Sequence, residues 1–128
     1  MQNLYLEATN DTPGVLFDPL NEVYEITGRF LHEDATDFFR PILDWLTDYS
    51  GEPQERTIFA FKMNYFNTAA SKAILDILMI LEEIVESGYE VLVHWHFPED
   101  DPDMEEAGIE YSEMVDVAFK LIPYQQEE

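Results

Sequence analysis

The chain has no cysteine and few basic residues, and both shortages narrow the functions it can have. Without a thiol among its 128 residues, it has no disulfide, no thiolate nucleophile and no thiolate metal site. Six lysines and arginines stand against 28 aspartates and glutamates, a net charge of −22 at pH 7. A surface of this sign repels phosphate backbones and anionic lipids. We therefore expect no nucleic-acid partner and no membrane partner.

Clustered glycines and long apolar runs are also missing. The five glycines are all isolated, so neither a P-loop nor a dinucleotide-binding loop can be built, and we expect no cofactor. The most apolar stretch, Ala73 to Leu81, is interrupted by Asp76 and is much shorter than the ~20 residues of a membrane-spanning helix. The first residues lack the basic and apolar regions of a secretory signal. These absences predict a cytoplasmic protein.

What the chain does have is the material for a packed core. Nine phenylalanines, seven tyrosines and two tryptophans accompany an apolar content of 46%. Such a composition favours a folded protein over the disorder that is typical of very acidic chains. The length suits one domain spanning residues 1–128.

Hydrophobic residues follow period 2 in some segments and periods of three and four in others. We predict strands at residues 4–8, 14–18, 22–30, 57–65, 89–97 and 117–122, helices at 35–50, 67–87 and 104–114, and a polar tail at 123–128. This order predicts an α/β fold: a mixed sheet that opens with an antiparallel meander and carries crossover helices packed on it.

Three details of this prediction concern individual elements. Pro41 indicates that the first helix either begins near Asp37 or Phe38 or is kinked. The strand at 57–65 is apolar on both faces at its start, which predicts a central strand buried on both sides. Gly108 weakens the helical pattern of 104–114.

The histidines are the candidates for a metal site. His94 and His96 would lie on one face of a strand, within reach of one ion, but the further ligands would have to come from His32 or from the acidic run at 99–103. That run lacks the spacing of a calcium loop and is interpreted as a solvated loop. We predict no metal site and keep His94 and His96 as weak candidates.

The most informative position is the passage from the strand at 57–65 into the long helix. Asn67, Thr68 and Ser71 surround the start of that helix. One interpretation is structural, because these residue types cap helices. The other is functional, because a phosphate on a hydroxyl there would meet free backbone N–H groups and the positive end of the helix dipole. Residues 35–72 carry four basic and five acidic side chains, whereas residues 99–128 carry one and eleven.

Several segments together resemble the SiaC-like family of bacterial regulatory phosphoproteins. They are Thr12-Pro13, Ile42-Leu43-Asp44-Trp45-Leu46, Tyr65-Phe66-Asn67-Thr68, Lys72-Ala73-Ile74-Leu75-Asp76-Ile77-Leu78, Leu81-Glu82-Glu83, Val91 and Trp95-His96. The resemblance implies a STAS-like fold with Thr68 as the phosphoacceptor. It also implies a partner-switching kinase of the histidine-kinase-like ATPase type, a PP2C-type phosphatase, and a diguanylate cyclase that the unphosphorylated form binds and activates.

The sequence therefore predicts a switch protein without enzymatic activity. Thr68 would carry the phosphate beside Asn67, Ser71 and Lys72, and the apolar arc with Leu75 and Met79 would be a candidate docking face. Two alternatives stay open: a constitutive acidic interaction module, and a metal-binding protein that uses the two strand histidines.

Overall fold

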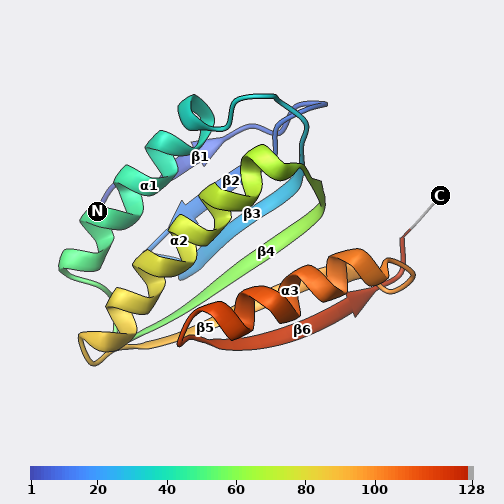
Figure 1. The fold of residues 1–128 in the computed structure, drawn as a ribbon. Helices are drawn as coiled ribbons and strands as arrows, with labels where there is room; N and C mark the ends of the chain where they lie inside the picture. Colours follow the sequence, from blue (N-terminus) through green and yellow to red (C-terminus); the bar gives the residue numbers. More distant parts are fainter. Residues whose placement is uncertain (127–128) are drawn as a thin grey trace.

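The structure, a computed structural model, describes residues 1–126 as one sheet covered by helices (Figure 1). The elements are β1 (Leu4–Leu6), β2 (Gly14–Asp18), β3 (Val23–Phe30), α1 (Thr36–Gly51), β4 (Arg56–Phe66), α2 (Thr68–Glu86), β5 (Glu90–Pro98), α3 (Pro102–Met114) and β6 (Ala118–Tyr124). Their order and type confirm the predicted sequence of strands and helices.

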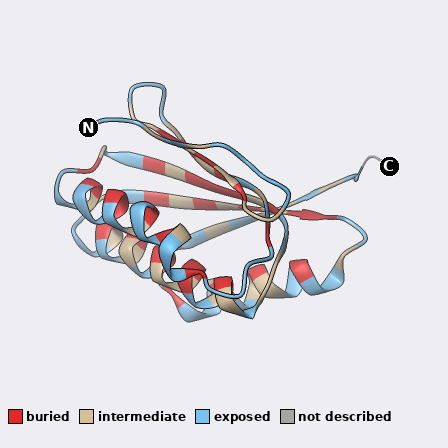
Figure 2. Cartoon of the chain, turned by 90° about the horizontal axis from the view of Figure 1, so that it is seen from above, coloured by how far each residue is buried: buried red, intermediate tan, exposed pale blue. Residues whose placement is uncertain are grey.

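The six strands lie side by side in the order in which they occur along the chain. β1, β2 and β3 pair antiparallel, whereas β3, β4, β5 and β6 pair parallel. Each parallel connection passes through one helix and moves one strand further in the same direction. Because such crossovers share one hand, all three helices lie on the same face of the sheet (Figures 1 and 2). The predicted α/β class, with its opening meander, is confirmed.

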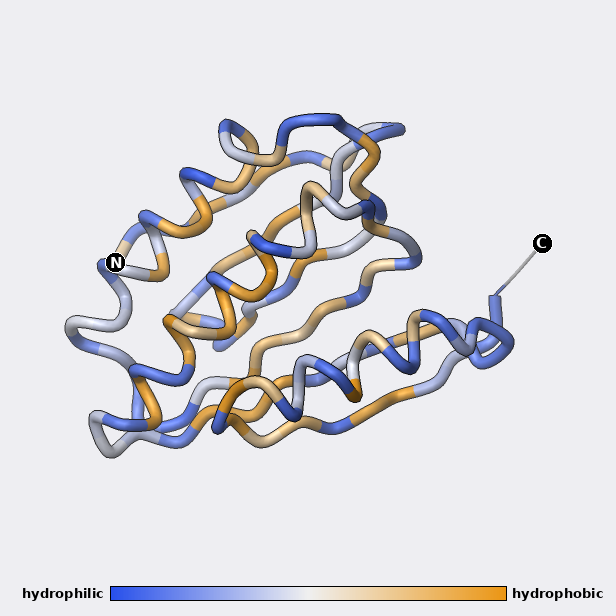
Figure 3. The backbone as a smooth tube through the Cα atoms, viewed as in Figure 1, coloured by the Kyte–Doolittle hydropathy of each residue, from blue (hydrophilic) through white to orange (hydrophobic). Residues whose placement is uncertain are grey.

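The core lies between the helices and the sheet face that they cover. Hydrophobic and hydrophilic segments alternate along all three helices (Figure 3). The largest side chains that are almost completely buried are Phe17, Ile26, Phe30, Phe39, Ile42, Leu46, Tyr49, Phe59, Phe61, Met63, Ile74 and Trp95. Burial of this much aromatic surface supplies the main driving force for folding.

Within residues 1–126, the other face of the sheet has no helix over it (Figure 2). Along β4, Lys62 is half-buried and Asn64 is exposed, while their neighbours Phe61 and Met63 point into the core. The prediction that this strand is buried on both sides is therefore wrong. The strand is central and its start is apolar, but all three crossover helices cover the same face of the sheet.

α1 begins at Thr36, within the predicted range of 35–50 and one residue before the later start near Asp37 that Pro41 suggested as one alternative, and Pro41 lies inside it. Proline has no N–H to donate to the preceding turn, which weakens a helix interior. The helix forms nonetheless because its buried side packs on the sheet; Phe39 and Ile42, on either side of the proline, are almost completely buried.

α3 is two residues longer than predicted, and Gly108 lies within it. Asp101 caps the helix, since its Oδ1 accepts a hydrogen bond from the Met104 N–H at 3.1 Å, and Asp103 lies in the first turn. The interpretation of 99–103 as a solvated loop is therefore wrong for its second half. Gly108 permits α3 to lie on the ring of Trp95, as a Cβ there would be 2.4 Å from Cδ1 of the indole.

β6 extends to Tyr124, so Pro123 and Tyr124 belong to the sheet and not to the predicted polar tail. Proline is tolerated here because β6 is an edge strand. Residues 127–128 of that predicted tail lie outside the described residues. Within residues 1–126, no helix has both the length and the apolar character needed to span a bilayer.

Candidate functional site

The β4–α2 junction (residues 66–72) begins with Asn67, which caps α2. Its backbone is extended, with φ −93° and ψ 179°, and its Oδ1 accepts a hydrogen bond from the Ala70 N–H at 3.1 Å. The other end of the same amide donates to the carbonyl of His32 at 2.7 Å. Asn67 therefore stabilises the helix and also holds the segment before α1 against the start of α2.

Thr68 is the first residue of α2, and its side chain is exposed. Because Asn67 provides the cap, the Thr68 hydroxyl has no hydrogen-bond partner within residues 1–126. The first turn of α2 contains no acidic residue, in contrast to those of α1 and α3. An added anion at Thr68 would thus face unpaired backbone N–H groups and the positive helix end, with no neighbouring carboxylate in that turn.

Ser71 and Lys72 lie one turn further along α2. The Ser71 hydroxyl donates to the Thr68 carbonyl at 2.7 Å, so it is already engaged. The Ser71 carbonyl accepts a hydrogen bond from the Tyr111 hydroxyl of α3 at 2.8 Å, and burial raises the pKa of Tyr111 to about 12. Lys72 is 85% exposed, with its ammonium 3.9 Å from the Asp76 carboxylate. In this group, Thr68 has an unengaged hydroxyl and Lys72 has an exposed ammonium whose contact with Asp76 is long, so these two side chains are the ones available to a partner.

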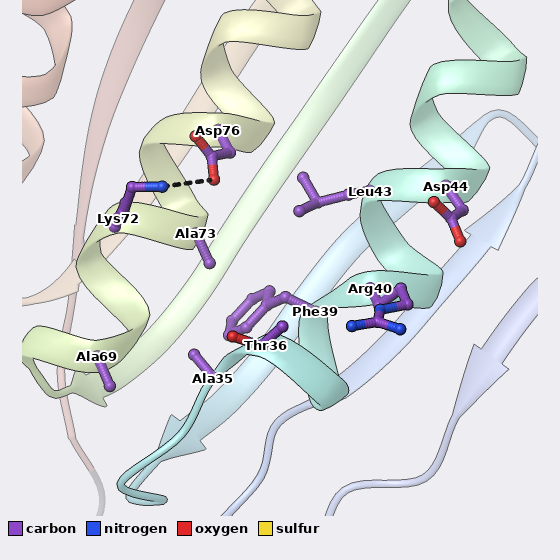
Figure 4. Close-up of a pocket in the computed structure, with 10 residues that line it drawn as sticks. All are labelled: Ala35, Thr36, Phe39, Arg40, Leu43, Asp44, Ala69, Lys72, Ala73 and Asp76. Carbon is purple, nitrogen blue, oxygen red and sulfur yellow. Dashed lines mark ion pairs between the residues drawn. The ribbon is translucent and has the colours of Figure 1, made fainter.

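Two grooves run beside the junction. One, of about 290 Å³, separates α1 from α2 and is drawn in Figure 4; its lining residues are Ala35, Thr36, Phe39, Arg40, Leu43, Asp44, Ala69, Lys72, Ala73 and Asp76. The other, of about 360 Å³, separates α2 from α3 and is lined by Phe66, Ser71, Lys72, Leu75, Ala107, Glu110, Tyr111 and Met114. Lys72 borders both grooves, so a movement of its side chain would change the rim of each.

The two predicted docking residues differ in burial. Leu75 is half-buried, packs against the core and lines the α2–α3 groove. Met79, one turn further on the same side of α2, is 49% exposed. Part of the predicted apolar arc is therefore core, and its outer part is free surface.

Comparison with known proteins decides the family. A model described as SiaC family regulatory phosphoprotein matches residues 6–124. The chain belongs to the SiaC family. Membership makes it a regulatory protein and not an enzyme, and it confirms the resemblance that the junction motif and its flanking segments indicated.

Relatives of this SiaC-family chain come from Pseudomonas aeruginosa. An uncharacterized protein of strain UCBPP-PA14 is 26% identical over 121 residues, which are 94% of this chain and 96% of that protein. The crystal structure of apo-SiaC is 26% identical with a TM-score of 0.86, covering 95% of this chain and 99% of that one. A chain in the crystal structure of diguanylate cyclase SiaD in complex with its activator SiaC is 25% identical with a TM-score of 0.88, covering 94% and 99%.

The strand histidines of this SiaC-family chain lie on the uncovered face of the sheet, away from the junction. The His94 and His96 rings are 6.3 Å apart, and no cluster of three or more potential metal ligands occurs in the part of the chain that the structure describes. Burial, followed by the charges of Lys120, Arg56 and Lys62, lowers the pKa of His94. Burial and nearby cations also lower the pKa of His96. His32, the third candidate, instead lies 3.2 Å from Asp11.

Sequence reasoning missed the two contacts that hold the junction in place. The Asn67 amide bonds a carbonyl 35 positions earlier, and the Tyr111 hydroxyl bonds a carbonyl 40 positions earlier. Neither carbonyl carries a side-chain signal. Tyr111 lies at the border between the apolar and polar sides of α3, and a buried tyrosine hydroxyl usually finds a hydrogen-bond partner. This is the one sequence feature that could have suggested a partner for it.

Replacing Asn67 by alanine is expected to lower the free energy of unfolding by about 1–2 kcal/mol, because both the cap and the bond to His32 are lost. Thr68→Ala is expected to change it by less than about 0.5 kcal/mol, as an exposed side chain without a hydrogen bond is removed. Urea denaturation of the two variants beside the wild type measures both values. Equal losses would assign the capping role to Thr68 as well.

Proposed function

We propose that this SiaC-family chain is a signalling switch that is phosphorylated on Thr68. The observation that carries the proposal is the division of roles at the junction: Asn67 caps α2, which leaves the Thr68 hydroxyl exposed and unengaged within residues 1–126. A kinase can reach this hydroxyl without opening the fold. Membership of a family of regulatory phosphoproteins supports the proposal.

Phosphorylation would change the charge of the surface around the junction. A phosphothreonine adds about two negative charges and three strong acceptor oxygens. Lys72 follows four residues later on the same side of the helix, and its contact with Asp76 is long and exposed. The phosphate would compete for this ammonium with a shorter, charge-assisted hydrogen bond. Because Lys72 borders both grooves, the rims of both would be rearranged.

We infer three partners for the switch. A partner-switching kinase of the histidine-kinase-like ATPase type adds the phosphate, a PP2C-type phosphatase removes it, and a diguanylate cyclase is the effector. The solved complex of diguanylate cyclase SiaD with its activator SiaC, whose fold this chain shares, supports the last of these. The kinase and the effector consume nucleoside triphosphates, so the switch is placed in the cytoplasm.

The effector would bind the unphosphorylated form over the start of α2 and its outer surface. Met79 supplies exposed apolar area there, and Leu75 forms the wall of the adjoining groove. An interface that covers Thr68 would bury any phosphate attached to it. A phosphate buried without compensating donors is costly, so phosphorylation would release the effector.

The phosphoacceptor is tested by incubation with a partner-switching kinase of this type and with ATP, followed by mapping of the phosphate by mass spectrometry. We expect one phosphate on Thr68, and its loss in Thr68→Ala. Ser71→Ala is the matched control, because that hydroxyl lies one turn away but is bonded to the Thr68 carbonyl. A phosphate on another residue, or unchanged labelling of Thr68→Ala, would contradict the proposal.

A further inference from the structure

The face of the sheet that carries no helix, here called the open face, differs in charge from the rest of the molecule. The part considered as the open face is formed by the outward-pointing side chains of β3, β4, β5 and β6; Leu16 of β2 and Tyr5 of β1 continue the row of Glu25 beyond it. Its charged members are Arg29, Arg56, Lys62 and Lys120, with Glu25 and Glu90. Four of the six basic residues of a chain with net charge −22 are thus gathered here, and most carboxylates lie elsewhere.

The strand register arranges the open face in rows that cross the sheet. Ala60 stands beside Glu25 and beside His94, and His94 stands beside Lys120. This row therefore has a carboxylate at its β3 end and an ammonium at its β6 end. The next row towards the start of the strands is apolar, with Ile58, Leu92 and Ala118 side by side. The row beyond it pairs Arg56 with Glu90.

We propose that two copies of this chain associate through their open faces around a two-fold axis that runs parallel to the strands, between β4 and β5. Such an axis lays β3 over β6 of the second copy and β4 over its β5, without shifting the rows. Glu25, whose carboxylate is 3.0 Å from Lys62 of its own copy, then also faces Lys120 of the second copy. Arg56, 3.7 Å from its own Glu90, faces the Glu90 of the second copy. These two rows are complementary to themselves, as a two-fold interface requires.

The side chains also match in size and polarity across this axis. Small Ala60 faces the imidazole of the second copy's His94, and Ile58 faces its Leu92. The hollow of about 450 Å³ that Thr27, Lys62 and His96 help to line spans the axis, so it lies opposite the same hollow of the second copy and Lys62 faces its His96. Two sheets packed in this way keep a separation of about 10 Å, which these side chains fill.

The area of the open face indicates a weak dimer. Four strands about 4.8 Å apart, over about seven residues with a rise of about 3.3 Å, make a flat footprint of about 440 Å² per copy, which side-chain relief enlarges. Stable interfaces bury about 800 Å² per partner, so this one belongs to the smaller, transient class. The overall charge of each copy opposes association, while the facing charges favour it. Because salt screens the long-range repulsion first, dimerisation should increase with ionic strength.

Sedimentation velocity between about 0.05 M and about 1 M NaCl tests the proposal. We expect the dimer fraction to rise with salt and to fall in Lys120→Glu and in Glu25→Lys. It should recover in part in the double variant, which restores the facing pair but not the ion pair of Glu25 with Lys62. Lys72→Glu is the matched control, because it changes the net charge equally on the helix side. A monomer at every salt concentration, or an equal loss in Lys72→Glu, would overturn the proposal. If the open face bound an acidic partner instead of a second copy, that association would weaken as the salt concentration rises.

Crosslinking tests the position of the axis independently. The chain has no cysteine, so Ala60→Cys introduces one thiol close to the axis. A short bismaleimide should join two copies of this variant and should not join copies of Met79→Cys, on the helix side. Equal crosslinking of both would contradict the geometry. Thr68→Glu should dimerise like the wild type, because Thr68 lies outside the open face, so the dimer and the phosphorylation switch can fail separately.

Discussion

Thr68→Glu is expected to weaken binding of the diguanylate cyclase effector roughly a hundredfold, whereas Thr68→Ala should bind like the unmodified protein. A hundredfold loss corresponds to about 2.8 kcal/mol, which is within the cost of burying a charge without adequate partners. The fold should not suffer, because a carboxylate in the first turn of a helix interacts favourably with the helix dipole, by about 0.3–1 kcal/mol. Binding and stability should therefore change in opposite directions.

Isothermal titration calorimetry with the purified effector measures the affinities. Thr47→Glu is the matched control, because it adds the same charge at an exposed position of α1, eleven residues beyond the start of that helix. Equal affinities of Thr68→Glu and Thr68→Ala would show that the chain is a constitutive binding module and not a switch. Loss of binding in Thr47→Glu as well would assign the effect to overall charge.

Gly108→Ala is expected to destabilise the protein by about 1–3 kcal/mol, although alanine is the better helix former by about 1 kcal/mol. The added Cβ would be 2.4 Å from Cδ1 and 2.7 Å from Nε1 of Trp95. That indole cannot retreat easily: it is 1% exposed, and its Nε1 donates to the Met104 carbonyl at 3.0 Å. The strain must move α3 away from the sheet or turn the ring.

Urea denaturation and the near-ultraviolet circular dichroism of the tryptophans measure this effect. Gly51→Ala is the control, since Gly51 also lies in a helix but its Cβ would have no neighbour within 4 Å. That variant should be as stable as the wild type or slightly more stable. If Gly108→Ala left the free energy of unfolding unchanged, α3 could shift without cost and its contact with Trp95 would be loose.

Most elements could be predicted because their signals are local. Asn67 and Gly88 bracket α2 closely, and the alternation of buried and half-buried residues in β5 follows the sequence pattern. The wrong prediction that β4 is buried on both sides has a different origin. Ile58 and Ala60 are apolar enough for a covered strand, and nothing near them in the chain records that all three helices pass over the opposite face. That fact depends on the direction of three separate crossovers.

The site was predictable in position but not in its division of roles. Asn67, Thr68 and Ser71 are all residue types that cap helices, and a shift of one residue exchanges their roles. The structure selects Asn67, whose amide also reaches the carbonyl of His32, a contact between segments far apart in the chain. This distant contact holds Asn67 in the capping position, and the threonine is therefore left free.

The order of the strands bears on how the protein is made. Every strand after the first pairs with the strand synthesised immediately before it. A growing chain can therefore add one strand and one helix at a time from its N-terminal end, and no strand has to wait for a partner that the ribosome has not yet released. The antiparallel partners β1, β2 and β3 are close in sequence, which favours rapid pairing of these three strands. A protein so rich in negative charge thus assembles its sheet without leaving unpaired interior strands exposed for long.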